Sequence, residues 1–298
     1  MNDKYLAIVN PAAGGGRCGK LAPAALEKLR AAGLALEVRE TRAPGNATVF
    51  AYDGYTAGFR NFIAVGGDGT GFEIVNGIFP STLTEGRAAL GFLPLGTGNS
   101  FLRDFTDRGA DYAIESILAR RRRPCDVIRL NHAGESLFYI NTLNMGFAAD
   151  VATLTNRRLK FMGELGYLVG VLVSLARLRR RPFPLRADGE RDERRCLFVA
   201  FSNSKYTGGK MMIAPQAAID SGSIEYVHWG PIGRGGLVQT LPKLFDGSHI
   251  RHTMASRRTA SRIEFDFKEP VDVVVDGEVL TLEVESLEVL PGALDVMV

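Results

Sequence analysis

The sequence predicts an α/β domain followed by a β-rich domain, and two observations support this division. As far as Arg123, short apolar stretches alternate with helical patterns, which is typical of a parallel sheet with helices on both faces. After Pro124 most of the patterned segments are β-rich, which indicates an antiparallel sandwich or barrel. The expected fold class is an N-terminal doubly wound parallel α/β domain and a C-terminal antiparallel β-sandwich domain.

The elements of the first domain follow from short apolar runs and their breakers. Residues 5–9 read Tyr-Leu-Ala-Ile-Val, a continuous apolar run that predicts a buried strand. Gly33 is expected to end the first helix, because glycine is favoured just past a helix C-terminus. The predicted strands are residues 5–9, 34–38, 61–65 and 89–93, and the predicted helices are 21–32, 47–57 and 70–79.

The second domain contains few helical patterns. Its two candidate helices are the apolar run 161–178, which has a basic C-terminal end, and residues 237–245. We place the domains at 1–123 and 124–298, and the last residues could pair with either domain. The predicted strands are residues 126–130, 136–141, 196–202, 224–228, 262–267, 271–275 and 279–289.

Composition excludes several classes of protein. With 46% hydrophobic and 23% charged residues the chain reads as soluble and globular. The net charge of +3 is too small to predict a nucleic-acid partner. The cysteines Cys18, Cys125 and Cys196 are odd in number and lack metal-ligand spacing, which predicts reduced thiols in a cytoplasmic protein. There is no signal-peptide pattern, and the run 161–178 is short for a transmembrane segment.

Arginines are clustered at three places, and the clusters have two interpretations. They are residues 120–123, then Arg177 with 179–181, and Arg251 with Arg257, Arg258 and Arg262. Taken singly, each cluster is interpreted as a solvated helix end or loop. Together they would attract an anionic membrane surface, where each basic residue adds about 1 kcal/mol. The second interpretation predicts a cytoplasmic protein that associates peripherally with membranes.

Three glycine-rich loops each follow an apolar strand of the first domain. They are residues 10–16, 66–70 and 94–99. Because the carboxyl ends of parallel strands share one edge, the loops are expected to converge there and to cradle a polyphosphate with their backbone amides. The expected nucleotide-binding residues are Asn10, Pro11, Gly14, Gly66, Gly67, Gly69, Thr70, Gly96, Thr97, Gly98 and Asn99.

The first loop also fits two other templates. Gly14, Gly16 and Gly19 match the spacing of a dinucleotide fingerprint, with Glu40 near the distance of its ribose-binding acid. Residues 14–20 nearly match a Walker A loop, but Leu21 stands where that motif needs Ser or Thr for Mg²⁺. The dinucleotide interpretation stays open as an alternative, although it leaves the second and third loops without a role.

Asp68 is a carboxylate inside the second glycine turn. Beside a phosphate its charge would be repulsive, so a metal-binding or proton-transfer role is the functional interpretation. The structural interpretation is that Asp68 caps the helix expected to begin near Thr70. The four histidines form no constellation with Ser or Cys, and no Gly-x-Ser-x-Gly motif is present, so a serine hydrolase is not expected.

These motifs resemble the diacylglycerol kinase catalytic family, which includes sphingosine and ceramide kinases and soluble bacterial lipid kinases. Residues 66–77 read GGDGTGFEIVNG and residues 95–99 read LGTGN, both similar to signatures of that family. Ser100 stands where the family usually has Asp. Residues 203–215 resemble its glycine-rich segment, and residues 276–278, Asp-Gly-Glu, resemble its late motif. The resemblance covers nearly the whole chain.

The resemblance implies a lipid kinase that uses ATP and Mg²⁺ in a cleft between its two domains. Asp276 would accept the proton of the lipid hydroxyl, Glu278 would orient Asp276 or hold Mg²⁺, and Asp68 would complete the catalytic set. Bacterial members carry a structural Mg²⁺ site, which would correspond here to Asp220 and Glu225, although Ser221 replaces one expected acid. The expected partner is a lipid at a membrane surface, and a homodimer is compatible with the sequence.

Three alternatives remain open at this stage. From local sequence alone, Asp276-Gly277 is a strong two-residue hairpin turn with no catalytic role. The enzyme could instead resemble NAD kinases and use a soluble acceptor, which an apolar acceptor cleft in the second domain would argue against. The third alternative is a non-catalytic nucleotide- or lipid-binding protein of the same fold.

Overall fold

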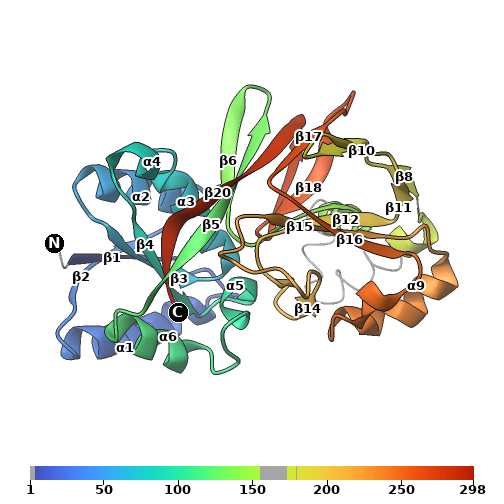
Figure 1. The fold of residues 1–298 in the computed structure, drawn as a ribbon. Coiled ribbons are helices and arrows are strands. Elements are labelled where there is room, and N and C mark those ends of the chain that lie inside the picture. Colours follow the sequence, from blue (N-terminus) through green and yellow to red (C-terminus); the bar gives the residue numbers. More distant parts are fainter. Residues whose placement is uncertain (1–3, 155–172, 179) are drawn as a thin grey trace. The chain divides into compact units, whose positions relative to one another are not determined.

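The computed structural model describes residues 4–154, 173–178 and 180–298, and the chain divides into two compact units. The first unit comprises residues 1–127, 138–140 and 290–298, and the second comprises 128–137 and 141–289. The predicted fold class is confirmed, since the first unit contains a parallel sheet with helices and the second an antiparallel sheet (Figure 1). None of the helices in the described ranges is long and apolar enough to span a membrane.

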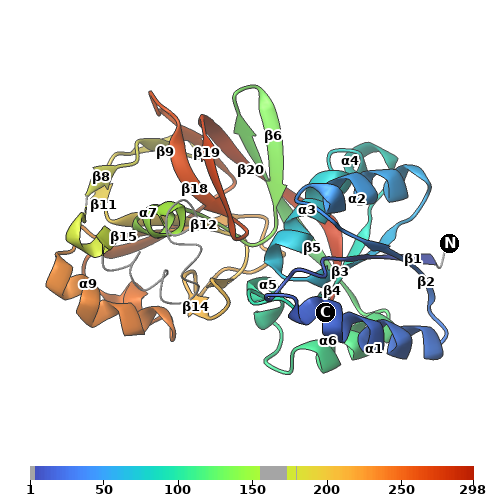
Figure 2. The same cartoon turned by 180° about the vertical axis from the view of Figure 1, so that it is seen from behind.

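The sheet of the first unit has the strand order β2-β1-β3-β4-β20, and all neighbours are parallel. Helices α1 and α6 cover one face, and α2, α3 and α4 cover the other (Figures 1 and 2). The strands are β1 (Lys4–Val9), β2 (Ala35–Glu40), β3 (Asn61–Gly66), β4 (Ala89–Pro94) and the end of β20 (Val284–Met297); the helices are α1 (Arg17–Ala31), α2 (Asn46–Thr56), α3 (Asp68–Ile78), α4 (Thr82–Glu85), α5 (Ser100–Arg103) and α6 (Ala110–Leu118).

The second unit is built on an antiparallel sheet of order β16-β15-β12-β7-β18-β19. Its strands, some of which share residues with the first unit, are β5 (Arg122–His132), β6 (Glu135–Tyr139), β7 (Thr142–Gly146), β8 (Arg181–Pro182), β9 (Leu185–Ala187), β10 (Glu190–Asp192), β11 (Arg195–Cys196), β12 (Phe198–Ser202), β13 (Tyr206–Thr207), β14 (Met211–Met212), β15 (Ile224–Trp229), β16 (Ala255–Ala260), β17 (Arg262–Phe265), β18 (Val271–Val275), β19 (Glu278–Leu282) and the start of β20; its helices are α7 (Phe147–Leu154), α9 (Arg234–Thr240), η3 (Leu241–Leu244) and η4 (Ser248–Arg251).

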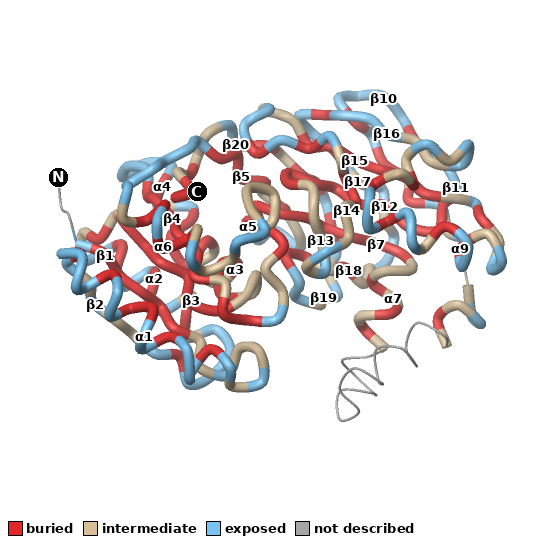
Figure 3. The backbone as a smooth tube through the Cα atoms, turned by 90° about the horizontal axis from the view of Figure 1, so that it is seen from below, coloured by how far each residue is buried: buried red, intermediate tan, exposed pale blue. Residues whose placement is uncertain are grey.

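The central strands of both units are buried. Every residue of β3 is buried, and so is every residue of β4 except Pro94 at its end, as expected for parallel strands between two helical layers (Figure 3). β12 and β15 are equally buried, so this antiparallel sheet is covered on both faces. On one face Phe201 of β12 packs edge-on against Phe265 of β17 at 5.3 Å between ring centroids, which forms the sandwich. The other face carries Phe198 and Trp229, which pack in one apolar cluster with side chains of α9 and η3.

Several predicted elements differ from those observed. The first helix begins at Arg17 rather than at residue 21, and the predicted 237–245 helix is α9 followed by a 3₁₀ turn containing Pro242, which cannot donate a helical hydrogen bond. The stretch 279–289 is divided between β19 and β20, and the prediction missed β7, α6 and α7. β5 runs through the predicted boundary at Pro124. Most of the predicted helix 161–178 lies outside the described residues.

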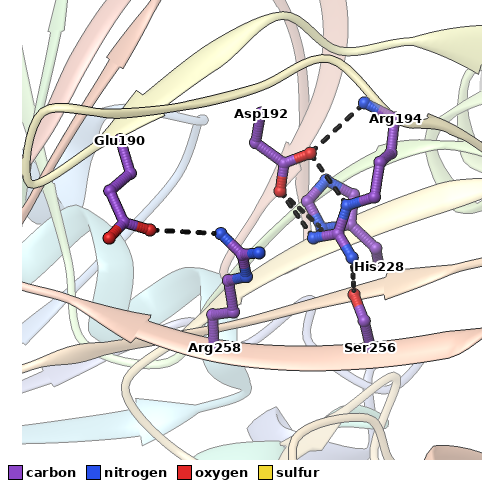
Figure 4. A network of polar contacts seen from close by, with 6 residues as sticks. All are labelled: Glu190, Asp192, Arg194, His228, Ser256 and Arg258. Atoms are coloured by element: carbon purple, nitrogen blue, oxygen red, sulfur yellow. Dashed lines mark hydrogen bonds and ion pairs between the residues drawn. The ribbon is translucent and has the colours of Figure 1, made fainter.

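A polar network lies at one edge of the sandwich (Figure 4). The Arg194 guanidinium donates to both carboxylate oxygens of Asp192 and approaches Nδ1 of His228 at 3.4 Å. Arg194 and the nearby His228 help to hold the pKa of Asp192 at about 2, despite its burial. Burial lowers the pKa of His228 to about 4. The neighbouring Asp192 carboxylate would raise this pKa, but its effect is smaller than that of burial. His228 is therefore neutral in the folded protein at pH 7 and accepts from Arg194.

This network predicts an acid-sensitive second unit. The folded pKa of His228, about 4, lies below its ordinary value of 6.5, so the unfolded chain binds the proton first as pH falls. The free energy of unfolding should thus drop by about 2–3 kcal/mol between pH 6.5 and 4 because of this one residue. His228→Gln keeps an acceptor for Arg194 and removes the titration. Urea unfolding followed by Trp229 fluorescence should give a shallower pH dependence for the variant, and parallel curves for both proteins would contradict this account.

Candidate functional site

The three glycine loops of the first unit meet at the carboxyl ends of β1, β3 and β4. The amide of Asn10 donates to Val65 at 2.9 Å, which ties the first loop to the end of β3. The amide of Gly96 donates to the carbonyl of Gly66 at 2.7 Å, and the amide of Asp68 donates to the carbonyl of Gly98 at 3.0 Å. The loops therefore converge as the sheet-edge argument predicted.

Glycine is required where these loops touch. A Cβ atom on Gly96 would lie 2.8 Å from the amide nitrogen of Gly67, and one on Gly67 would lie 2.8 Å from the carbonyl oxygen of Gly98. Gly14 has a φ of +63°, and its Cβ would lie 3.3 Å from the carbonyl oxygen of Leu95. Side chains at these positions would push the loops apart, so the sequence needs glycine to bring three backbones together.

The Asp68 carboxylate binds the third loop rather than its own helix. Helix α3 begins at Asp68 without a side-chain cap, so the structural interpretation, in which Asp68 caps that helix, does not hold. Both oxygens instead accept the amide of Ser100 at 2.9 Å, and one also accepts the amide of Phe101 at 3.4 Å. Ser100 and Phe101 begin α5, so the carboxylate satisfies helix amides from a different element. Burial raises the pKa of Asp68, and the two amides oppose that rise.

The remaining predicted residues of this unit lie around the junction. Asn10 accepts the amide of Ala12, and Asn99 donates to the carbonyl of Gly96 at 3.1 Å. Gly69 lies in the first turn of α3, while Thr97 is exposed. Pro11 accepts the amide of Gly19 at 3.1 Å, which packs α1 against its loop. These contacts set the shape of the three loops.

Thr70 provides the observation that favours a phosphate ligand. Its residue is 4% exposed, and its hydroxyl has no hydrogen-bond partner within the described part of the chain. A Cβ on Gly66 would lie 2.4 Å from this hydroxyl, so the space beside it is kept by glycine. A buried polar group without a partner is costly, and a phosphate oxygen would satisfy it. The residues present therefore fit the phosphates of a nucleotide.

Glu73 and Asn76, which follow the GGDGT segment in α3, bind neighbouring elements of the first unit. Glu73 accepts the amides of Gly45 and Ala47 at 3.0 and 2.9 Å, which satisfies the first turn of α2. Asn76 donates to the carbonyl of Phe138 at 2.8 Å and accepts its amide at 2.9 Å. This part of the motif thus fastens α2 and β6 to α3 inside the first unit.

In the second unit, Asp276 forms both a turn and a buried carboxylate. Asp276 and Gly277 connect β18 to β19 with φ values of 47° and 92°, as a two-residue hairpin turn requires. The residue is only 3% exposed, and its Oδ1 accepts the amides of Asn141 and Thr142 at 3.1 and 2.9 Å. The turn prediction is correct, and it also fixes a carboxylate on β7. Glu278 is exposed at the start of β19.

Close to this hairpin lies a polar group that sequence reasoning missed. Asn144 donates through Nδ2 to the hydroxyls of Thr142 at 3.0 Å and Thr207 at 3.3 Å. Thr142 and Asn144 alternate with apolar residues in β7, which is the pattern of a strand with one polar face. That alternation was a signal in the sequence, but by itself it indicates a solvated face rather than a buried one.

An apolar cavity of about 290 Å³ lies within the second unit. The six-stranded sheet forms one wall, and α7, α9 and η3 contribute the others. The polar contributions come from Asn144 and Thr207, and Gly277 places the Asp276 hairpin at its edge. The apolar lining comes from Phe147, Val151, Phe198, Met211, Ile213, Trp229, Leu237, Leu241, Leu244 and Val274.

Asp220 and Glu225 are the residues predicted to hold a structural Mg²⁺ ion. Glu225 is 2% exposed on β15 and lies 3.2 Å from the guanidinium of Arg257, while Asp220 is exposed. Burial raises the pKa of Glu225 in spite of Arg257. No group of three or more His, Cys, Asp or Glu side chains able to hold a metal occurs among the described residues. The structural Mg²⁺ site at Asp220 and Glu225 therefore stays a prediction.

Many of the clustered arginines have local partners. Arg257 pairs with Glu225, Arg258 with Glu190 and Arg262 with Glu264. Arg181 binds both oxygens of Asp150, and Arg121 and Arg123 lie over the rings of Tyr112 and Phe105. These contacts agree with the simpler interpretation, in which most clustered arginines support the local fold.

The first unit is a parallel sheet with converging glycine loops, and the second is a β-sandwich. Together they define the class of two-domain lipid kinases. Residues 4–130 match the diacylglycerol kinase catalytic domain, and residues 141–298 match the YegS C-terminal NAD kinase beta sandwich-like domain. The chain is 30% identical to "Probable lipid kinase YegS-like" of Pseudomonas aeruginosa strain UCBPP-PA14, over 92% of this chain and 88% of that protein. It is 26% identical to the diacylglycerol kinase of Bacillus subtilis strain 168, over 91% and 88%.

Solved structures show the same fold. A diacylglycerol kinase from Bacillus anthracis strain Sterne superimposes with a TM-score of 0.74 at 24% identity, covering 99% of this chain and 96% of that one. The chain therefore belongs to the YegS and diacylglycerol kinase family of lipid kinases, and it is an enzyme of the lipid kinase class. This membership confirms the resemblance seen in the glycine loops and favours it over the dinucleotide template.

The loop junction predicts a graded response to added methyl groups. Gly96→Ala should lower the free energy of unfolding by about 1–3 kcal/mol, because its Cβ meets the backbone of the second loop. Gly98→Ala is the matched control, since its Cβ meets only the Asp68 side chain, at 3.3 Å. Chemical unfolding of both variants should show the larger loss for Gly96→Ala. Equal losses would show that the loops are not held at this distance.

Proposed function

We propose that this protein is an ATP-dependent kinase that transfers a phosphoryl group to a hydroxyl of a membrane lipid. The observation that carries the proposal is the apolar cavity of the second unit, whose edge is formed by the Asp276–Gly277 hairpin. Apolar side chains line most of it, so an acyl chain would gain about 25 cal/mol for each Å² of apolar surface that it buries there. A soluble, polar acceptor such as NAD would gain nothing from this lining.

The nucleotide is assigned to the first unit. Backbone amides of the first and third loops bind its phosphates, and the hydroxyl of Thr70 donates to a phosphate oxygen. Mg²⁺ bound with the nucleotide would neutralise phosphate charge during transfer. Asp68 holds the third loop against the second through Ser100, and we assign it this positioning role in place of direct metal binding.

The acceptor hydroxyl is assigned to the second unit, near Asp276. The hydroxyl oxygen forms a bond to the γ-phosphorus while the bond from that phosphorus to ADP breaks, and the hydroxyl proton passes to the Asp276 carboxylate. Two amides hold Oδ1 of Asp276 in place, so the direction of the carboxylate is set before substrate binds. Glu278 is exposed at the start of β19, and this step does not require it.

Asp276→Asn separates catalysis from folding. Asparagine retains an Oδ1 atom that can accept the amides of Asn141 and Thr142, and Asn-Gly suits the same turn. Turnover of a lipid extract with γ-labelled ATP should fall by about 10²–10⁴-fold, while ATP affinity stays near that of the wild type. Asp272→Asn, in the same hairpin, is the control and should retain wild-type turnover.

Three outcomes would contradict the proposal. Wild-type turnover in a folded Asp276→Asn protein would show that the aspartate only makes the turn. Label that enters NAD but no lipid from the extract would favour the NAD kinase-like alternative. ATP binding without transfer to any acceptor would support the non-catalytic alternative.

We also propose that the lipid is reached at an anionic membrane surface, where this enzyme binds peripherally. Arginines 120–123, 180 and 251 are exposed and would carry the positive charge for this contact. Vesicle binding should rise with the fraction of anionic lipid and fall as salt increases from 0.05 to 0.5 M, since the Debye length shortens from roughly 14 to 4 Å. Sedimentation with neutral and anionic vesicles measures this, and equal binding to both would contradict the surface contact.

A further inference from the structure

The side-chain amide of Asn144 has a direction imposed by its neighbours. Its Nδ2 donates to Thr142 at 3.0 Å and to Thr207 at 3.3 Å, and the hydroxyl of Thr142 lies 3.3 Å from that of Thr207. With Nδ2 directed at two hydroxyl oxygens, Oδ1 is turned away from them. Asn144 is 2% exposed and forms part of the cavity wall.

The Asn144 Oδ1 atom is a buried acceptor with no donor. Across the described ranges of the chain, no group donates a hydrogen bond to it. Leaving a buried acceptor unsatisfied is unfavourable, and an apolar side chain of similar size would avoid the cost. An acceptor kept at the wall of an otherwise apolar cavity therefore points to a ligand that supplies the missing donor.

The face of the sheet that carries Asn144 changes from polar to apolar along its strands. Side chains at alternate positions share one face, so Thr142, Asn144 and Gly146 of β7 lie in line with Ser202, Ala200 and Phe198 of β12. Trp229 stands opposite Phe198 at the apolar end. The polar end begins at Thr142, whose amide also binds Asp276. Such a face suits an amphiphile whose head lies near Thr142 and whose chain lies near Trp229.

Taken together, these contacts identify the missing donor. We propose that Asn144 is a specificity-determining residue that accepts a hydrogen bond from a second donor of the lipid, an O–H or N–H beside the hydroxyl that receives phosphate. The inference rests on the proposed function for the identity of the first hydroxyl. It predicts that lipids with two neighbouring donors are preferred over lipids whose second position is an ester or ether.

The size of the cavity is compatible with one chain. A volume of about 290 Å³ equals that of about ten water molecules, enough for a single short apolar chain within the described residues. Suitable probes are therefore 1-octanoylglycerol, which has two free hydroxyls, and 1-octanoyl-2-O-methylglycerol, which has one. The two differ by one donor and keep the same acyl chain.

Trp229 allows binding to be measured without catalysis. It is the single tryptophan of the chain and lines the cavity, so its fluorescence should respond when either probe enters. Wild-type protein should bind 1-octanoylglycerol about 10-fold more tightly than the methyl ether, the range expected for one buried hydrogen bond. Asn144→Leu should bind both probes with similar affinity. Asn131→Leu, a matched change at a half-buried asparagine bound to Ser286 in β20, should retain the 10-fold preference.

The outcomes separate this inference from the proposed function. Equal wild-type affinities for the two probes, or an unchanged preference in a folded Asn144→Leu protein, would overturn the role of Asn144. No fluorescence response to either probe would overturn the cavity as the ligand site, and the inference with it. A clear preference in binding without transfer of phosphate from ATP to 1-octanoylglycerol would support the Asn144 site and count against the proposed function alone.

Discussion

The close approach of Gly67 and Gly96 is the constraint on which the first unit depends. With a Cβ at Gly96 only 2.8 Å from the amide of Gly67, the second and third loops can meet only as bare backbone. That contact brings the Asp68 carboxylate within 2.9 Å of the Ser100 amide, so α5 begins where it does. It also leaves the hydroxyl of Thr70 buried beside Gly66 and without a partner. The geometry proposed to bind phosphate and the geometry that holds the sheet edge are therefore the same.

In the second unit, the pairing of β18 with β7 positions both candidate residues. The pairing of β18 with β7 sets Val275 opposite Leu143, and the next residue, Asp276, turns back and binds the amides of β7. The same register aligns Asn144 with Val274 on the cavity face. Thr142, at the start of β7, binds the catalytic candidate Asp276, and the specificity candidate Asn144 lies two residues later in the same strand. The sheet therefore fixes the distance between Asp276 and Asn144.

The sequence predicted what depends on local pattern. Continuous apolar runs such as β3 predict buried parallel strands, and glycines after such runs predict loops that can converge. The helix around residues 47–57 was also predictable from its pattern. What needed tertiary structure was the partner of each polar group: Asp68 binds an amide 32 residues away, and Asp276 binds one 134 residues away. Neither contact can be predicted from the residues near it in the sequence.

The polar residues of β7 show the same limit from the other side. Thr142 and Asn144 alternate with Leu143 and Met145, a pattern that usually describes a strand with one solvated face. Here that face is buried by α7 and α9 around a cavity, and only the packed structure reveals that Oδ1 of Asn144 lacks a donor. Position in the sheet, rather than residue type, gives these side chains their role.

The central claim is that the cavity of the second unit holds the acyl chain of the lipid acceptor. Photo-crosslinking with a monoacylglycerol that carries a diazirine in its chain, followed by peptide mass spectrometry, tests it most directly. The account predicts labelling at cavity residues such as Phe198 and Trp229, with competition by unlabelled 1-octanoylglycerol. Labelling confined to exposed surface positions, or labelling that 1-octanoylglycerol does not reduce, would contradict it.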